Sequence, residues 1–253
     1  GHNVTAVDVD PDVVAALNDG RPGIEEPRLA DIVATHAGPD GTGRLRATTN
    51  YNALNDAALF FLALPTPSRE DGSVDTSYVE AGARSLAPVV AERDDYPVVV
   101  VKSTVVPGTA EEVIAPALES AGTVVGETAG LAVNPEFLRE GSAVADFRDP
   151  DKLVFGIADS DDRSLAALHE VYGPLVDAAD PSVVETSRRA AELIKYANNA
   201  FLATKVSLIN EIGNICKEYG IDAYEVAEAV GLDDRIGAQF LRSGLGWWGS
   251  CFP

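Results

Sequence analysis

Two short stretches of the sequence carry side chains suited to acyl chemistry. Cys251 stands in GWWGSCFP near the end of the 253-residue chain, and a thiolate there could attack a carbonyl carbon and later leave from a thioester. Lys195 and Asn199 are four residues apart in a helical pattern, so they would share one face and could stabilise the oxyanion formed on a carbonyl. Each also has an ordinary interpretation, because a terminal cysteine is usually inert and a helix lysine is usually solvated.

Carboxylates and hydroxyls follow the predicted strands. Glu136 and Glu140 in NPEFLREG have the same spacing, at the expected start of a helix after a strand. A carboxylate at that position is stabilised by the helix N-terminus, and it lies at the carboxyl edge of the sheet, where α/β folds bind their ligands. The alternative interpretation is that these glutamates only cap the helix. Thr104 in KSTVVPGT could orient a water or only cap the next helix. Thr66 in LPTP ends another strand, and turn formation by the prolines explains it almost as well.

Composition indicates a large globular protein that avoids polyanions. Forty acidic against nineteen basic residues give a net charge of −21, so nucleic acid and anionic membranes are poor partners. Such a surface repels itself in dilute buffer, whereas at about 1 M salt the Debye length is about 3 Å and the repulsion is screened. The charge therefore indicates a protein of a high-salt cytoplasm, and the alternative is an ordinary acidic protein. The sequence shows neither a membrane span nor a signal peptide, which predicts a cytoplasmic location. Two cysteines and three scattered histidines predict no metal site, and Cys216 is interpreted as a packing residue.

The first 187 residues alternate strand and helix patterns. Runs that are apolar at every position indicate strands buried on both faces, and the fold class is therefore α/β, with a doubly wound, mostly parallel Rossmann-like sheet. The predicted strands cover 4–10, 57–64, 96–104 and 130–136, and the predicted helices cover 11–20, 75–93 and a segment after Pro107.

From residue 188 the pattern becomes helical. The stretch 188–219 contains no proline and one internal glycine, and its apolar residues recur every three or four positions, which predicts one long helix. Shorter helices are expected near 222–230 and 233–243. We therefore expect a nucleotide-binding domain at 1–187 and a helical domain at 188–253.

Asp8 ends the first strand, where a dinucleotide-binding fold places the acid that bonds the ribose hydroxyls. The glycine-rich phosphate loop should lie about 20 residues earlier, yet only seven residues precede Asp8. Asp8 is thus either an ordinary strand-end acid or part of a fold that has lost its first strand, glycine loop and first helix. The opening GHNV, which looks like a helix end entering a strand, favours the loss.

Six stretches of the chain form a set in a fixed order: VDVDPDVVAALNDGRPGIEEPRL, LPTP, KSTVVPGT, NPEFLREGSAVADFRDPDKLVFG, AELIKYANNAFLATKVSLINEIGNICKEYGID and GSCFP. Together they resemble the UDP-glucose/GDP-mannose dehydrogenase family, above all its UDP-glucose-oxidising branch. The resemblance implies that NAD is used twice: the 6-hydroxyl of UDP-glucose becomes an aldehyde, a cysteine adds to it, a second hydride transfer leaves a thioester, and water releases UDP-glucuronate.

The same resemblance implies roles for individual residues, and a homodimer formed through the long helix. Cys251 would be the nucleophile, Lys195 and Asn199 would stabilise the oxyanion, and Glu136 and Thr104 would hold the hydrolytic water. The NAD contacts would be made by Asp8, Thr66, Ser103, Thr104 and Glu140. The sugar-nucleotide contacts would be made by Glu136, Phe137, Leu138, Arg139, Lys195, Asn199 and Arg235.

The chain also departs from the family pattern. Trp248 stands where the family usually has glycine, and the expected glycine loop, the lysine–aspartate pair and the C-terminal nucleotide-sugar domain are missing, so we expect the 253 residues alone to be inactive. Three alternatives remain open. They are a sibling that oxidises GDP-mannose or a UDP-N-acetylhexosamine, a single-hydride dehydrogenase of the hydroxyacid or 6-phosphogluconate type, which needs no cysteine, and a non-catalytic binding module.

Overall fold

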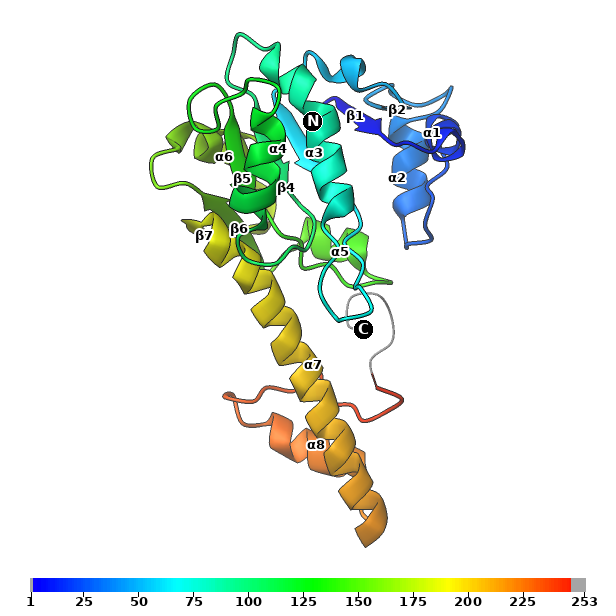
Figure 1. The fold of residues 1–253 in the computed structure, drawn as a ribbon. Coiled ribbons are helices and arrows are strands. Elements are labelled where there is room, and N and C mark those ends of the chain that lie inside the picture. Colours follow the sequence, from blue (N-terminus) through cyan, green and yellow to red (C-terminus); the bar gives the residue numbers. More distant parts are fainter. Residues whose placement is uncertain (1, 247–253) are drawn as a thin grey trace. The chain divides into compact units, whose positions relative to one another are not determined.

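The structure, a computed structural model, describes residues 2–246, which divide into two compact units (Figure 1). The first comprises 2–66 and 74–192, and the second comprises 67–73 and 193–246. The predictions for Cys251 and Trp248 fall outside the described residues. Among the helices of 2–246, none has the length and apolar character needed to cross a membrane.

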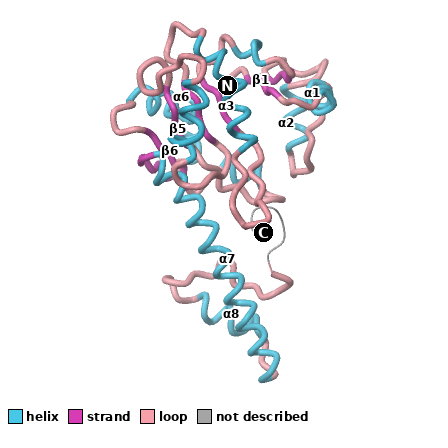
Figure 2. The backbone as a smooth tube through the Cα atoms, in the orientation of Figure 1, coloured by secondary structure: helices cyan, strands magenta, loops and turns pink. Residues whose placement is uncertain are grey.

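The first unit holds two sheets, a small one and a five-stranded one with the order β3-β4-β5-β6-β7 (Figure 2). All neighbouring strands are parallel except β5 and β6, which confirms the mostly parallel, Rossmann-like prediction. The small sheet pairs β1 (Val4–Val7) with β2 (Leu45–Thr48). The large sheet contains β3 (Leu59–Leu62), β4 (Val98–Val101), β5 (Gly130–Val133), β6 (Lys152–Ile157) and β7 (Ser182–Ser187).

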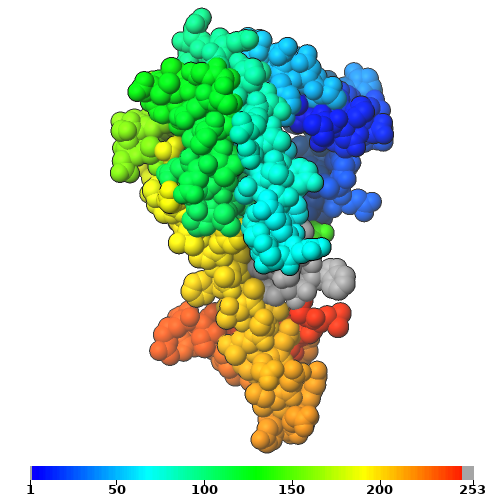
Figure 3. All heavy atoms as spheres, in the orientation of Figure 1, coloured from blue at the N-terminus to red at the C-terminus, as the bar shows by residue number. Residues whose placement is uncertain are grey.

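Two helices of the first unit, α1 and α6, begin at an aspartate whose side chain caps them. Asp10 accepts the N–H of Asp12, and Asp161 accepts that of Ser164, each at the first turn of a helix. The helices are α1 (Pro11–Asn18), α2 (Leu29–His36), a 3₁₀ turn η1 (Tyr51–Leu54), α3 (Ser77–Ala91), a π-helical turn η2 (Ala110–Ile114), α4 (Ala115–Glu119), α5 (Ala143–Arg148) and α6 (Asp162–Ala179). In Figure 3 the atoms of α3 (cyan) and of the segment 110–119 (green) lie side by side, and α3 contacts α4.

The core of the first unit surrounds the two central strands. Every residue of β4 and β5 is buried, as the continuous apolar runs predict for strands covered on both faces. Phe155 and Leu168 complete this core from β6 and α6. Burial of such side chains is worth about 1.5–3 kcal/mol each, so the centre of the large sheet is its most strongly stabilised part.

The small sheet contributes much less to burial. Neither β1 nor α1 contains a buried residue, and the side chain of Val4 is 50% exposed. Among the described strands β1 pairs only with β2, and β3 pairs only with β4. Each of β1 and β3 therefore leaves one edge without a strand partner in the described part of the chain.

The long helix forms over the predicted range, as α7 (Arg188–Tyr219), whose residues from Leu193 onward belong to the second unit. It is followed by α8 (Ala223–Gly231), and Ile209, Ala227 and Leu241 form a small core there. Cys216 is buried in α7, as the packing interpretation expects.

The helix predicted at 233–243 does not form, and this stretch consists of turns. The carboxylate of Asp233 accepts the N–H of Arg235, a bond of the kind with which Asp10 caps α1. Gly237 and Phe240 both have positive φ angles, of 70° and 64°, which a right-handed helix excludes.

Candidate functional site

The carboxyl ends of β3 and β4 are joined by side chains that the sequence singled out. The hydroxyl of Ser103 accepts the N–H of Leu64 (2.7 Å) and donates to the carbonyl oxygen of the same residue (2.7 Å). The hydroxyl of Thr66 donates to the carbonyl oxygen of Thr104 (2.7 Å). Strand-end loops at the carboxyl edge are where ligands bind in open α/β sheets. The structure therefore brings Thr66, Ser103 and Thr104 together at this edge.

A second group of polar side chains lies at the same edge, between β4, β5 and α6. The ammonium group of Lys102 donates to Asn134 Oδ1 (2.8 Å) and to the hydroxyl of Tyr172 (3.3 Å), and that hydroxyl donates to Asn134 Oδ1 (2.5 Å). Burial raises the pKa of Tyr172 to about 12. We call these residues the Lys102–Asn134–Tyr172 cluster. Sequence reasoning missed it, although Lys102 and Asn134 stand at strand ends inside the quoted stretches KST and NPE.

Glu136 and Glu140 lie in a loop rather than on a helix, because α5 starts only at Ala143. The expectation that they share a helix face is therefore wrong. Glu136 Oε2 accepts the N–H of Leu138 (2.6 Å), Asp146 accepts that of Arg139 (2.8 Å), and Gly141 has a φ angle of 84°, which a right-handed helix excludes. The loop still follows β5 directly, so both glutamates remain near the carboxyl edge of the sheet.

The neighbouring substrate candidates have partners within the first unit. Arg139 forms an ion pair with Asp146, in which Nη2 lies 2.5 Å from Oδ1, and this pairing lowers the pKa of Asp146 to about 2. The ammonium group of Lys152 stands 4.2 Å from the ring centre of Phe137. Leu138 is 40% exposed. Leu138 and Arg139 are thus both exposed to solvent, the side chain of Arg139 to 64%, whereas Phe137 is half-buried.

Asp8 stands just beyond β1, on the small sheet and apart from the strands that carry the other candidates. Its Oδ1 accepts the N–H of Asp10 (2.9 Å), a turn that fixes the carboxylate at the carboxyl end of the strand. A strand-end carboxylate is the acceptor that ribose hydroxyls require in dinucleotide-binding folds. The residue and its position therefore fit an adenosine ribose.

In the second unit Lys195 and Asn199 are one turn apart on α7, as expected. Lys195 is only 6% exposed, which is unusual for a lysine and excludes an ordinary solvated side chain. Arg235 is different: its guanidinium pairs with Asp233 (2.6 Å) in an exposed turn, and its side chain is 89% exposed. The second unit thus presents Lys195 and Asn199 together, with Arg235 in a local pair.

Glu192, which opens the stretch ELIKYANNAF, is a buried carboxylate that sequence reasoning missed. Its two oxygens accept the N–H groups of Gly108 (2.6 Å) and Ala110 (2.8 Å), at the start of η2. Burial raises the pKa of Glu192. The residue anchors the beginning of α7 to the loop that follows Thr104. A charged residue in an otherwise apolar helical stripe is the signal that could have found it.

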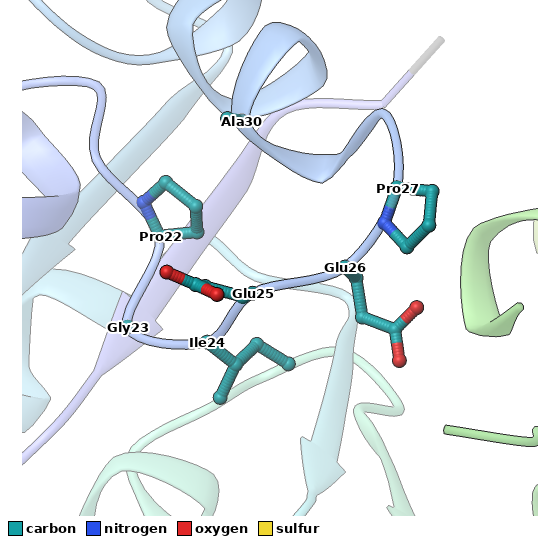
Figure 4. Close-up of a pocket in the computed structure, with 7 residues that line it drawn as sticks. All are labelled: Pro22, Gly23, Ile24, Glu25, Glu26, Pro27 and Ala30. Carbon is teal, nitrogen blue, oxygen red and sulfur yellow. The ribbon is translucent and has the colours of Figure 1, made fainter. Parts of the chain in front are cut away.

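A surface pocket of about 650 Å³ lies along the loop before α2, lined by Pro22, Gly23, Ile24, Glu25, Glu26, Pro27 and Ala30 (Figure 4). Figure 4 shows the carboxylates of Glu25 and Glu26 turned in opposite directions. Glu26 accepts the N–H groups of Gly141 (2.7 Å) and Ala143 (3.3 Å), at the start of α5. Two acids and no cation make this pocket unsuited to an anionic nucleotide. Across residues 2–246, no three His, Cys, Asp or Glu side chains are grouped to hold a metal ion.

Comparison with protein families matches the chain in two parts. Residues 1–176 match the NAD-binding domain of the UDP-glucose/GDP-mannose dehydrogenase family. Residues 189–253 match the central domain of the same family. The two matches follow one another in the order of that family's domains.

Individual relatives agree with these matches. UDP-glucose 6-dehydrogenase AglM of Haloferax volcanii is 53% identical over the whole chain, which spans 58% of that protein. GDP-mannose 6-dehydrogenase of Azotobacter vinelandii is 38% identical, and the chain spans 57% of it. The chain thus covers little more than half the length of these curated relatives.

Solved structures share the fold. A UDP-glucose dehydrogenase from Pyrobaculum islandicum superposes with a TM-score of 0.90 at 44% identity, covering the whole chain and 56% of that structure. A GDP-mannose dehydrogenase from Pseudomonas aeruginosa gives a TM-score of 0.87 at 35% identity, covering the whole chain and 57% of that structure. On this sequence and structural evidence, the chain belongs to the UDP-glucose/GDP-mannose dehydrogenase family.

Proposed function

We propose that this chain is part of an NAD-dependent enzyme that oxidises UDP-glucose to UDP-glucuronate by removing four electrons. The observation that carries the proposal is the set of polar residues at the carboxyl edge of β3, β4 and β5, within a domain that matches an NAD-binding family model. The relative at 53% identity, named as a UDP-glucose 6-dehydrogenase, supports the choice of sugar. The activity is assigned to the complete gene product, since the chain spans only 58% of that relative.

In the proposed reaction the dinucleotide binds along this edge, and NAD supplies the acceptor for each hydride leaving C6 of the sugar. Asp8 accepts hydrogen bonds from the ribose hydroxyls, a role suited to a strand-end carboxylate. Thr66, Ser103 and Glu140 border the path of the cofactor along the strand ends. Phe137, Leu138, Arg139 and Arg235 are assigned to the sugar nucleotide.

Cys251 is assigned the covalent step. Its thiolate adds to the C6 aldehyde, and the resulting thiohemiacetal loses a hydride and a proton to become a thioester. Lys195 and Asn199 stabilise the negative charge on the C6 oxygen while it is tetrahedral. A buried ammonium group is effective in this role because its field is weakly screened there.

Hydrolysis ends the cycle. Glu136 accepts a proton from a water molecule that attacks the thioester, and Thr104 orients that water by a hydrogen bond. The C–S bond breaks, the thiol takes up a proton, and UDP-glucuronate leaves. Both residues follow central strands of the large sheet, which supports a shared role.

We further propose the domain boundary near residue 187 and a homodimer formed through α7. Five large apolar side chains on the second unit's part of this helix are exposed, and at about 100° per residue four of them, all except Leu193, fall within a sector of about 40°. Such a continuous stripe fits a second copy of the same helix better than solvent. The side chains are Phe201 (75% exposed), Leu208 (60%), Ile215 (51%) and Tyr219 (77%).

The complete gene product with UDP-glucose tests the function. We expect two NADH for each UDP-glucuronate, no released aldehyde, and no turnover in Cys251→Ser, because an alcohol is a poor nucleophile and leaving group here. Cys216→Ser is the matched control and should retain turnover, since Cys216 is buried packing. We expect the 253 residues alone to be inactive.

Other outcomes select among the alternatives. If GDP-mannose or a UDP-N-acetylhexosamine is turned over faster than UDP-glucose, that sugar nucleotide is the substrate. One NADH per product, with Cys251→Ser fully active, would indicate a single-hydride dehydrogenase. Binding of NAD and UDP-glucose without any NADH would indicate a binding module.

A further inference from the structure

The Lys102–Asn134–Tyr172 cluster joins the two loops to which hydrolysis is assigned. Lys102 directly precedes Ser103 and Thr104, and Asn134 stands two residues before Glu136. We propose that the cluster is a positioning device that holds the Glu136 loop in register with Thr104 during hydrolysis of the acyl-enzyme. This inference rests on the proposed function and adds three residues that the reaction scheme does not use.

The hydrogen bonds of Asn134 make it the centre of the device. Its side chain is fully buried, its Oδ1 accepts from both Lys102 and Tyr172, and its Nδ2 donates to the carbonyl oxygen of Val154 on β6 (3.0 Å). Its backbone N–H donates to the carbonyl oxygen of Val101 (2.9 Å), which continues the β4–β5 pairing beyond both strands. Any rotation of this side chain would leave buried polar groups unpaired, at a cost of about 1–3 kcal/mol each.

Lys102 extends the connection to β3. Its backbone N–H donates to the carbonyl oxygen of Leu62 (2.9 Å), and the neighbouring Ser103 hydroxyl bonds Leu64. A continuous set of hydrogen bonds therefore runs across the ends of β3, β4 and β5 to β6. The Lys102 contribution to it is charge-assisted and hence stronger than a neutral bond.

The chain offers a matched pair of tyrosines for the test. Tyr172 donates to Asn134 at the carboxyl edge, whereas Tyr96, just before β4, donates to Asp161 Oδ1 (2.9 Å) at the opposite edge of the large sheet. The pKa of each phenol is raised to about 12, so both are protonated donors at neutral pH. Tyr172→Phe and Tyr96→Phe each remove one hydroxyl and keep the ring.

The experiment measures the steps separately in the complete gene product. In Tyr172→Phe we expect a rapid burst of two NADH per active site, followed by slower hydrolysis. The hydrolysis rate should fall about fivefold to tenfold, which corresponds to the loss of one hydrogen bond. The thioester on Cys251 should then accumulate, visible as an added mass on the intact protein, and kcat and KM for UDP-glucose should fall together so that kcat/KM changes little. Tyr96→Phe should lower the melting temperature without producing a burst.

Two variants of Lys102 keep the test valid if a tyrosine variant fails to fold. Lys102→Met should accumulate the thioester in the same way, and Lys102→Arg, which retains a cationic donor, should restore most of the hydrolysis rate. The positioning role is overturned if Tyr172→Phe hydrolyses the thioester at the wild-type rate, or if both tyrosine variants slow hydride transfer and hydrolysis equally. Either result leaves the proposed function intact. If wild-type protein forms no NADH from UDP-glucose, the proposed function fails, and this role with it.

Discussion

Arg139 and Asp146 form a pair in which the carboxylate has the more perturbed pKa. Hydrogen bonds from Arg139 lower the pKa of Asp146 from 3.8 to about 2. Because the pKa is lower in the folded state, the ionised carboxylate stabilises that state at pH values above the pKa of the unfolded chain. This contribution is lost as the pH falls from about 4 to about 2. Because the side chain of Arg139 is 64% exposed, we expect the contribution to be at most about 1 kcal/mol.

Asp146→Asn should therefore lower the free energy of unfolding at pH 6, and the difference from wild type should shrink at pH 2.5. Denaturant titrations at the two pH values measure it. The control is Asp19→Asn, whose partner Arg21 is 68% exposed, and which should change little at either pH. A loss for Asp146→Asn that is equal at both pH values would show that the pair does not contribute in this way.

Residues at strand ends were predictable, and residues that depend on distant contacts were not. Thr66, Ser103 and Thr104 follow apolar runs, so the rule that ligands bind at the carboxyl edge located them without a structure. Tyr172 lies mid-helix on α6 and meets Asn134 only through the tertiary fold. Nothing in the local pattern around it indicates that contact.

Glycine at 156 lets β6 and α7 approach closely. A Cβ there would stand 2.5 Å from Ala191 Cβ and 3.1 Å from the Cα of Arg188. Gly156→Ala should therefore destabilise the protein by about 1–3 kcal/mol, the range for overpacking. Gly173, on α6, has no atom within 4 Å of the corresponding position.

Gly173→Ala is the matched control and should change the stability less, because the helix preference of alanine is opposed by Pro174, which disfavours a helical residue with a Cβ before it. Thermal and denaturant unfolding of both variants measure the two effects. A neutral Gly156→Ala would mean that α7 can shift away from β6 without loss.

At the scale of elements, the spacing of apolar residues predicted a helix correctly where the local backbone conformation did not interrupt it. The range 188–219 was correct because its apolar stripe is long and uninterrupted by proline. No helix forms at 233–243 or around Glu136 and Glu140, because Gly237, Phe240 and Gly141 have positive φ angles that a right-handed helix excludes. The antiparallel pairing of β5 with β6 is a long-range feature that local patterns do not encode.

For the whole molecule, the proposed homodimer has a direct test. Phe201→Glu places a charge in the exposed apolar stripe of α7 and should weaken association at least tenfold. Ser207→Glu, at an exposed position of the same helix outside the stripe, is the control and should leave association unchanged. Sedimentation of the complete gene product at high salt measures both. A monomeric wild type, or equal effects of the two variants, would exclude this interface.

The unpaired edges of β1 and β3 carry a colloidal consequence. A strand edge with exposed N–H and C=O groups can template addition of another chain, and Phe61 on β3 is also 41% exposed. A net charge of −21 opposes such stacking by mutual repulsion between molecules. High salt screens that repulsion and acid neutralises the carboxylates, so under either condition the unpaired strand edges of neighbouring molecules can approach one another.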